Sequence, residues 1–264
     1  MRSSGMKILV CVKQVPEAEA EISVDASTRW IRVGGAAEYR MNRFDECAVE
    51  EAVLIKEAFP DTVIDVITAG PERAEAVVRR SMGMGADNGA HILTEMDGYV
   101  DAFATAGAIA AHARNKQYDL ILTGAMSEDL MQGQVGPLLA AHLEVACISS
   151  TIHAELTADL KKIYVEREVE GGSREAGTIH LPALLTIQTG INTPRYPALS
   201  KLLRANNKEL VVVAADLFEE AATPQRLAGV SLPEKTRDAV FLEGSTADKA
   251  EQLLDILRER SLLS

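Results

Sequence analysis

The feature that most constrains the fold is an alternation of short aliphatic runs with segments of helical periodicity. Residues 6–12, 63–69 and 118–123 are continuous apolar runs of strand length, and residues 74–84 and 102–115 between them have helical patterns. A parallel strand that is covered on both faces reads as such a continuous run. Strands that alternate with helices over short connections are typical of a doubly wound parallel sheet. The sequence therefore predicts an α/β fold.

The pattern changes after residue 146, where strand-like runs follow one another without a helix between them. Four such runs lie at residues 147–153, 163–170, 178–180 and 183–189. We expect them to form an antiparallel extension of the parallel sheet. Nearer the N-terminus, alternating apolar residues on both sides of a DAST segment predict a small hairpin over residues 21–33.

Residues 6–214 are expected to form the α/β domain, and residues 215–264 a C-terminal arm without a core of its own. The arm begins with a stretch rich in charged and small residues. A final helix over residues 247–260 has its apolar side chains on one stripe, formed by Ala250, Leu253, Leu254 and Leu257. Because such a stripe needs a surface to cover, we expect the helix to pack on its own domain or on another chain.

Acidic residues outnumber basic ones by 39 to 27, so the formal net charge is −12. Nucleic acids and anionic lipids bind to cationic surfaces, and this balance argues against both partners. No apolar run approaches the roughly 20 residues that cross a bilayer, and the first residues lack the pattern of an export signal. We expect a cytoplasmic protein without membrane insertion, in which local backbone geometry holds any nucleotide.

Residues for autonomous catalysis or metal binding form no recognisable pattern. The five histidines lack a metal-ligand spacing such as HExxH, and no nucleophile, base and orienting group can be combined. Cys11, Cys47 and Cys147 lie far apart in no CxxC pair, which favours buried thiols over a disulfide framework. We therefore expect no catalytic residue and no metal ligand.

Ligands of an open parallel sheet bind beyond the carboxyl ends of its strands, near the switch in strand order. Four loops meet this condition, at residues 13–16, 42–45, 69–71 and 124–136. Asn42 and Asp45 are also candidate caps of the helix that follows. The last loop places GQVG, residues 133–136, before a helix with Pro137 in its first turn, where free amides can hold a phosphate without a lysine. A phosphate cradle and an ordinary flexible loop both fit this local sequence.

A longer set of motifs resembles the beta subunit of electron transfer flavoprotein. The segments VEREVEGG, LPALLT and NTPRYPAL lie at residues 165–172, 181–186 and 192–199. Shorter matches precede them in family order: VKQVP at 12–16, NRFD at 42–45, MGAD at 84–87 and GQVG at 133–136. The resemblance implies a doubly wound parallel sheet of the adenine nucleotide alpha hydrolase-like kind, with an antiparallel extension and a C-terminal arm.

The same resemblance implies an alpha subunit that carries the redox FAD. It implies AMP with a structural role in this chain or, as in electron-bifurcating relatives, a second FAD that receives electrons from NADH. The positions that match nucleotide contacts, mostly through backbone, are Cys11, Lys13, Asn42, Ala69, Gly70, Gly133, Gln134 and Val135. The chain is then an electron carrier subunit rather than an autonomous enzyme, or part of an oxidoreductase if it bifurcates.

Three further positions match family contacts with partners. Phe44 matches a position near the alpha-subunit flavin, and Glu168 matches an acid that holds the mobile FAD domain by charge pairing. Leu199 matches the leucine that anchors partner dehydrogenases. The implied function passes electrons from an acyl-CoA-type dehydrogenase through the alpha-subunit FAD to a quinone oxidoreductase or another acceptor, with the arm 215–264 packed on the alpha subunit.

The sequence departs from the family pattern at three places. Where many relatives have DGDT or DDDCN before the glutamine, this chain has DLMQG at residues 129–133. Relatives have NP where this chain has Asn42-Arg43, and a lysine-rich KAKKK where it has RANNK at residues 204–208. The first departure leaves AMP and FAD as alternatives, and the last makes the partner-facing surface less basic. A free-standing nucleotide-hydrolysing protein is a third hypothesis, which requires activity without an alpha subunit.

Overall fold

The structure is a computed structural model that describes residues 5–94, 99–213, 227–233 and 239–263. The chain divides into two compact units, Met1–Val230 and Ser231–Ser264. Much of the first part of the predicted arm, at residues 214–226 and 234–238, lies outside the described residues. The association of the arm with another chain therefore stays a prediction.

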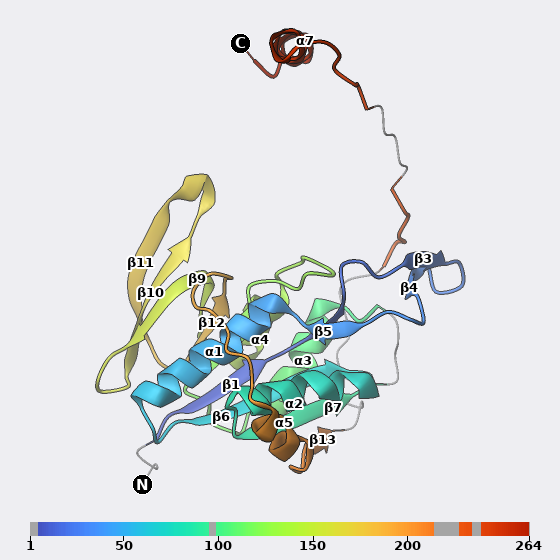
Figure 1. Cartoon of the computed structure of the whole chain (residues 1–264). Helices are drawn as coiled ribbons and strands as arrows, with labels where there is room; N and C mark the ends of the chain where they lie inside the picture. The colour runs from blue at the N-terminus through green and yellow to red at the C-terminus, as the bar shows by residue number, and fades with distance from the viewer. Residues whose placement is uncertain (1–4, 95–98, 214–226, 234–238, 264) are drawn as a thin grey trace. The chain divides into compact units, whose positions relative to one another are not determined.

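Within the described residues, the first unit contains a nine-stranded sheet in the order β11-β10-β9-β12-β8-β1-β6-β7-β13 (Figure 1). Neighbouring strands from β9 to β13 in this order pair in parallel, and β10 pairs antiparallel with both β9 and β11. This topology confirms the predicted parallel sheet with an antiparallel extension. The strand bounds are β1 Lys7–Cys11, β6 Val63–Gly70, β7 Asn88–Leu93, β8 Leu120–Gly124, β9 Ala146–Leu156, β10 Lys162–Glu168, β11 Arg174–His180, β12 Ala183–Ile187 and β13 Val211–Val213.

The prediction for β12 was wrong, because this strand belongs to the parallel part of the sheet. It lies between β8 and β9 and is parallel to both, with Leu184 opposite Ile121 on one side and Cys147 on the other. All five residues of β12 are buried. The local pattern indicates that such a strand is buried. Contacts between residues far apart in the sequence determine which strands it pairs with.

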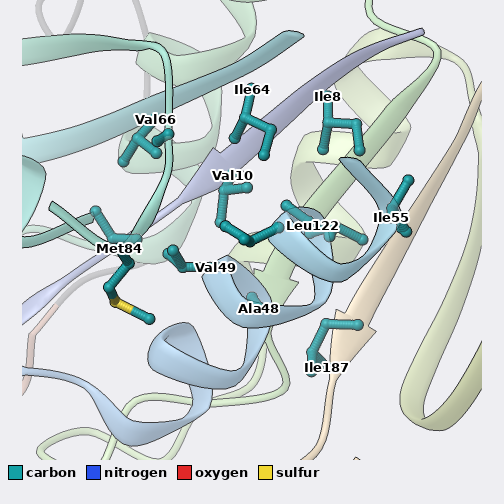
Figure 2. Close-up of a cluster of buried hydrophobic side chains, with 14 of the residues drawn as sticks. Ile8, Val10, Ala48, Val49, Ile55, Ile64, Val66, Met84, Leu122 and Ile187 are labelled. Carbon is teal, nitrogen blue, oxygen red and sulfur yellow. The ribbon is translucent and has the colours of Figure 1, made fainter. Parts of the chain in front are cut away.

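In the first unit, α1 and α2 cover one face of the sheet, and α3 and α4 cover the other (Figure 1). In β1, Ile8 and Val10 belong to the core cluster that includes α1 and α2, whereas Leu9 and Cys11 belong to the cluster that includes α3 and α4. Figure 2 shows Val10 beside Val49 of α1, with Ile8 farther along the same cluster. Each fully buried aliphatic side chain contributes about 1.5–3 kcal/mol to this packing. The helix bounds are α1 Arg43–Ala58, α2 Glu75–Met84, α3 Ala102–Ala113, α4 Val135–Leu143, α5 Leu199–Asn206 and α7 Thr246–Glu259, with short 3₁₀ turns at Glu72–Ala74 and Glu170–Gly172.

Two small antiparallel pairs accompany the main sheet. β3 (Ile22–Asp25) and β4 (Trp30–Val33) form the predicted hairpin, and β2 (Gln14–Pro16) pairs with β5 (Tyr39–Met41). In the second unit, Ser245 caps α7 in a capping box with Asp248. Such a box satisfies two backbone donors of the first turn, which explains where this helix begins.

The expectation of three buried thiols is confirmed for Cys11 and Cys47 and is wrong for Cys147, which is exposed. Cys147 is the second residue of β9, whose first two residues are both exposed. The neighbouring residue types alone did not reveal this exposure.

Candidate functional site

A cavity of about 520 Å³ lies at the carboxyl ends of β1, β6 and β8. This volume is in the usual range for small-molecule sites. The chain passes from β1 through β6 to β7 on one side of the sheet, and then continues on the other side of β1 with β8. The cavity therefore lies at the switch in strand order, where ligands of open α/β sheets bind. The structure brings together there all eight positions that match nucleotide contacts: Cys11, Lys13, Asn42, Ala69, Gly70, Gly133, Gln134 and Val135.

The loop before α4 lines this cavity and leads directly into the start of the helix. Gly133 has φ +62°, a left-handed conformation that favours glycine, and α4 begins two residues later at Val135. The first N–H groups of a helix have no partner within the helix and carry its positive dipole end. This end of the cavity is therefore suited to an anion such as a phosphate.

Gly136, the second residue of α4, has a different role. A Cβ atom at this position would lie 2.6 Å from Thr186 Cγ2 and 2.7 Å from Thr123 Oγ1. The missing side chain allows α4 to approach β8 and β12 closely. Of these two glycines, Gly133 therefore shapes the cavity and Gly136 positions the helix that supplies its amides.

Lys13 lies inside the cavity but is paired with an acid. Its Nζ atom lies 2.7 Å from both carboxylate oxygens of Asp129 and 3.3 Å from Ser127 Oγ. Among the described residues, the charged side chains of the lining are three basic and three acidic, namely Lys13, Arg32, Arg73, Asp25, Asp45 and Asp129. An anion in this cavity would depend on backbone amides more than on net positive charge.

Asn42 connects α1 with the loop that follows β8. Its Nδ2 atom donates to the carbonyl oxygen of Met126 at 2.9 Å, and its Oδ1 atom accepts from the N–H of Glu128 at 3.1 Å. The expected side-chain cap is wrong, because Asn42 occupies the N-cap position without a side-chain hydrogen bond to the helix. The amide instead fixes the loop, and this contact crosses 84 residues of sequence.

Asp45 is a buried carboxylate whose importance the sequence did not reveal. Its two oxygens accept the backbone N–H groups of Lys13 at 2.7 Å and Gly124 at 3.0 Å, so it joins the ends of β1 and β8. Burial raises the pKa of Asp45 to about 7, although these hydrogen bonds favour the ionised form. Gly124 permits this approach, because a Cβ there would clash with Asp45 and Phe44.

Ala69 and Gly70 form the end of β6 beside β7. The carbonyl oxygen of Gly70 lies 2.9 Å from Nε2 of His91 and accepts the N–H of Thr94 at 3.1 Å. His91 is 2% exposed, and this contact requires the tautomer with a proton on Nε2. The sequence suggested no role for His91, which holds the backbone at this end of the cavity.

Cys11 contributes packing rather than reactivity. Burial, followed by the charge of Asp45, raises the pKa of the Cys11 thiol well above its usual value. The thiol therefore stays protonated and is a poor nucleophile.

The three positions matched to partner contacts lie outside the cavity lining. Phe44 is half-buried in the first turn of α1, and Glu168 is exposed at the end of β10. Leu199 begins α5 and is 72% exposed. The cavity and these surface positions are thus distinct features of the first unit.

The hairpin residue Trp30 and the residue Tyr99 also line the cavity, and no motif had marked them. Their ring centroids are 4.8 Å apart. One signal for this pair is present in the sequence: Trp30 is the single tryptophan of the chain, and it lies in a predicted hairpin.

Within the described part of the chain, no helix is long and apolar enough to cross a membrane. The same described residues include no group of three or more His, Cys, Asp or Glu side chains that could hold a metal ion.

The structure combines a doubly wound sheet with a cavity at its switch point. This combination is typical of α/β proteins that bind small ligands at the carboxyl ends of their strands. The family model of the electron transfer flavoprotein domain matches residues 33–218. Relatives named electron transfer flavoprotein subunit beta are 34% identical in Bacillus subtilis, over 97% of this chain and 99% of the relative, and 32% identical in Bos taurus, over 89% and 95%. A third, from Thermoanaerobacterium thermosaccharolyticum, is 32% identical over 98% and 100%. The chain belongs to the family of electron transfer flavoprotein beta subunits.

Proposed function

We propose that this beta subunit holds AMP in the cavity and is part of an electron carrier that an acyl-CoA-type dehydrogenase reduces. Family membership implies an alpha subunit as partner and a flavin or nucleotide in the complex. The observation that supports a nucleotide in this chain is the convergence of all eight matched positions on one cavity at the sheet's switch point.

The residues around the cavity fit a mononucleotide. The amides at the start of α4 would hold the phosphate, and the Gly133 conformation aims this loop at the cavity. The Lys13–Asp129 pair leaves the lining without excess positive charge, as expected for a site that relies on backbone donors. Asn42 and Asp45 hold the two loops on either side.

In this function, the nucleotide bound by this chain is distinct from the flavin that transfers electrons. The FAD of the alpha subunit supplies the one-electron chemistry, while this chain positions partners. Phe44 would lie near that flavin, Glu168 would pair with the domain that carries it, and Leu199 would dock the dehydrogenase. The electrons then pass to a quinone oxidoreductase or another acceptor.

A bifurcating function is the second candidate. It would place FAD in the cavity of this chain and oxidise NADH there. The segment Gln134 to Pro137, which reads QVGP, favours this function by its resemblance to bifurcating members of the family. The nature of the bound nucleotide distinguishes the two functions.

The decisive experiment is to denature the purified heterodimer and identify the nucleotides that it releases. One FAD and one AMP per heterodimer is the expected result. Two FAD, together with bleaching of the flavin by NADH, would support bifurcation instead. Release of one FAD and no second adenine nucleotide would contradict both assignments of the cavity.

A pair of matched variants ties the nucleotide to the cavity. In Gly133→Ala, a side chain is forced to adopt φ near +62°, at a cost of about 1–2 kcal/mol, and the AMP content should fall while the FAD content is kept. Gly172→Ala carries the same kind of strain, since Gly172 has φ +74° and nothing within 4 Å of the added atom. This control lies in the turn between β10 and β11 and should keep its AMP.

A further inference from the structure

The cavity has two chemically different ends. At the end formed by β8 and α4, the lining comes from most of the glycine-containing loop between Gly124 and Val135, which leads into the start of α4. At the other end, beyond β6 and β7, the lining includes Thr94, Tyr99 and the hairpin residue Trp30. A nucleotide also has two different ends, an anionic phosphate and a planar base.

The order of the strands sets the distance between these ends. β8, β1, β6 and β7 are consecutive neighbours in the sheet. Three strand spacings of about 4.8 Å each give about 14 Å between the ends of β8 and β7. This separation is enough to place the phosphate at α4 and the base near the segment after β7.

Trp30 lies in β4, and its ring contacts the ring of Tyr99, which is distant in sequence. The two ring centroids are 4.8 Å apart and the ring planes are inclined by 54°. This distance is within the range of favourable aromatic pairs. Tyr99 precedes α3, so the contact holds the hairpin against the α3 side of the cavity.

The hairpin is otherwise held together by its own hydrogen bonds. Asp25 accepts from the backbone and hydroxyl of Ser27 and pairs with Arg32, and Gly34 donates its N–H to Glu21. Asp25, Thr28, Trp30, Ile31, Arg32 and Val33 all line the cavity. The hairpin therefore has hydrogen bonds of its own and contributes six residues to the lining of the cavity.

We propose that the indole of Trp30, oriented by its contact with Tyr99, packs on the planar base of the bound nucleotide. This inference rests on the proposed function, which places a nucleotide in the cavity. Stacking on an aromatic side chain suits any base, because every base has a flat π face. Trp30 is then a binding residue, and the phosphate and the base are held by separate elements of the chain.

The test uses the complete heterodimer with AMP bound and measures how fast AMP leaves it. Trp30→Ala should release AMP about tenfold faster, the loss expected when one base loses its aromatic platform. Trp30→Phe keeps a ring at the position and should stay within about threefold of the wild type. Ile22→Ala changes an exposed apolar residue of the same hairpin that does not line the cavity, and it should leave the release rate unchanged.

Fluorescence supplies a second readout that a purely structural role would not move. Trp30 is the only tryptophan of this chain, so subtracting the emission of Trp30→Phe from that of the wild type removes the contribution of the alpha subunit. We expect this difference emission to change when AMP is released. A difference emission that is identical with and without AMP would overturn the inference.

The remaining outcomes distinguish a failure of the Trp30 inference from a failure of the proposed function. AMP release from Trp30→Ala at the wild-type rate, or equal acceleration by Ile22→Ala, would show that Trp30 does not contact the base. Either result would leave the proposed function intact, because the wild type would still retain AMP. A wild-type heterodimer that retains no AMP would instead overturn the proposed cofactor and, with it, the role of Trp30.

Discussion

At the scale of single residues, Asp45 illustrates how one buried carboxylate can organise a site. It lies in the first turn of α1. It accepts hydrogen bonds from the backbone N–H of Lys13, in the loop after β1, and from that of Gly124, at the end of β8. Three segments that are distant in sequence meet at this one side chain. Truncation would leave two backbone N–H groups without their acceptors, each at a cost of about 1–3 kcal/mol.

Asp45 should also make stability depend on pH. Its pKa is raised to about 7 by burial, whereas in the unfolded chain it titrates near 3.8. The unfolded state therefore loses its proton first, so the contribution of Asp45 to stability is full below pH 4 and declines as the pH rises to 7. In Asp45→Asn, which does not ionise and lacks one of the two acceptors, the variant should be destabilised by about 1–3 kcal/mol at pH 5. The difference from the wild type should shrink by pH 8.

Unfolding midpoints of the heterodimer at pH 5 and pH 8 check this prediction. Asp61→Asn, at an exposed position between α1 and β6, is the matched control and should follow the wild type at both values. If the profiles of Asp45→Asn and the wild type run parallel, Asp45 does not titrate in this range.

Three glycines in and after the segment MGMGAD serve different purposes, namely Gly83, Gly85 and Gly89. Gly85 has φ +148° and ends α2. Gly83 lies inside α2, and Gly89 lies in β7. A Cβ at Gly83 would lie 2.6 Å from Leu202, and one at Gly89 would lie 2.5 Å from Val78. Both make room for packing partners, which no local pattern records.

At the scale of elements, α5 is held at both of its ends. The guanidinium of Arg195 bonds Glu50, which is buried on α1, and Glu57, and these carboxylates raise the pKa of Arg195 further above its ordinary value. At the other end, Arg79 of α2 donates to the carbonyl oxygen of Ala205 at 2.6 Å. Cations are favourable at such a helix end. The helix that begins at the matched residue Leu199 is thus held by contacts before its first turn and at its last turn.

This fixed helix presents Leu199 and Leu203 on neighbouring turns, with exposures of 72% and 55%. Leu199→Ala should slow reduction by the dehydrogenase by about tenfold or more, because a central anchor residue contributes about 2 kcal/mol or more to an interface. The flavin content should be unchanged, since α5 does not line the cavity. Stopped-flow reduction of the heterodimer measures the effect.

Leu54→Ala is the control for this experiment. Leu54 is an exposed leucine on α1, so the same truncation is made away from α5. Reduction of Leu199→Ala at the wild-type rate would show that the dehydrogenase docks elsewhere.

At the scale of the whole molecule, a chain this acidic would have to confine an anion site to one small region. The net charge of −12 opposes a general attraction of anions. The helix start at α4 and the neighbouring glycine loop concentrate positive dipoles at the switch point of the sheet. A nucleotide site is therefore compatible with a strongly acidic surface.

The second unit leads to a prediction about assembly. α7 is a helix of 14 residues, and isolated helices of this length are marginal in water. We propose that its stripe, which includes Leu253 and Leu254, packs on the alpha subunit. Replacing both with Gln should weaken the heterodimer by about 3 kcal/mol, or roughly a hundredfold, since burial of each leucine contributes at least about 1.5 kcal/mol.

Analytical ultracentrifugation over a dilution series measures this association. The double control Glu251→Gln with Asp255→Asn changes polar positions off the stripe and should dissociate like the wild type. An unchanged dissociation constant in the Leu253 and Leu254 variant would place the stripe outside the interface.

The sequence by itself determined the α/β class, the strands near residues 6–12, 63–69 and 118–123, the helices between them, the hairpin and the loops that line the cavity. These follow from periodicity, turn residues and motifs, which are local properties of the chain. Only the tertiary structure decided the place of β12 between two parallel neighbours, the bridging role of Asp45, the packing roles of Gly83 and Gly136, and the meeting of Trp30 with Tyr99. Each of these depends on the distance between residues far apart in sequence, and that distance exists only after the layers have packed.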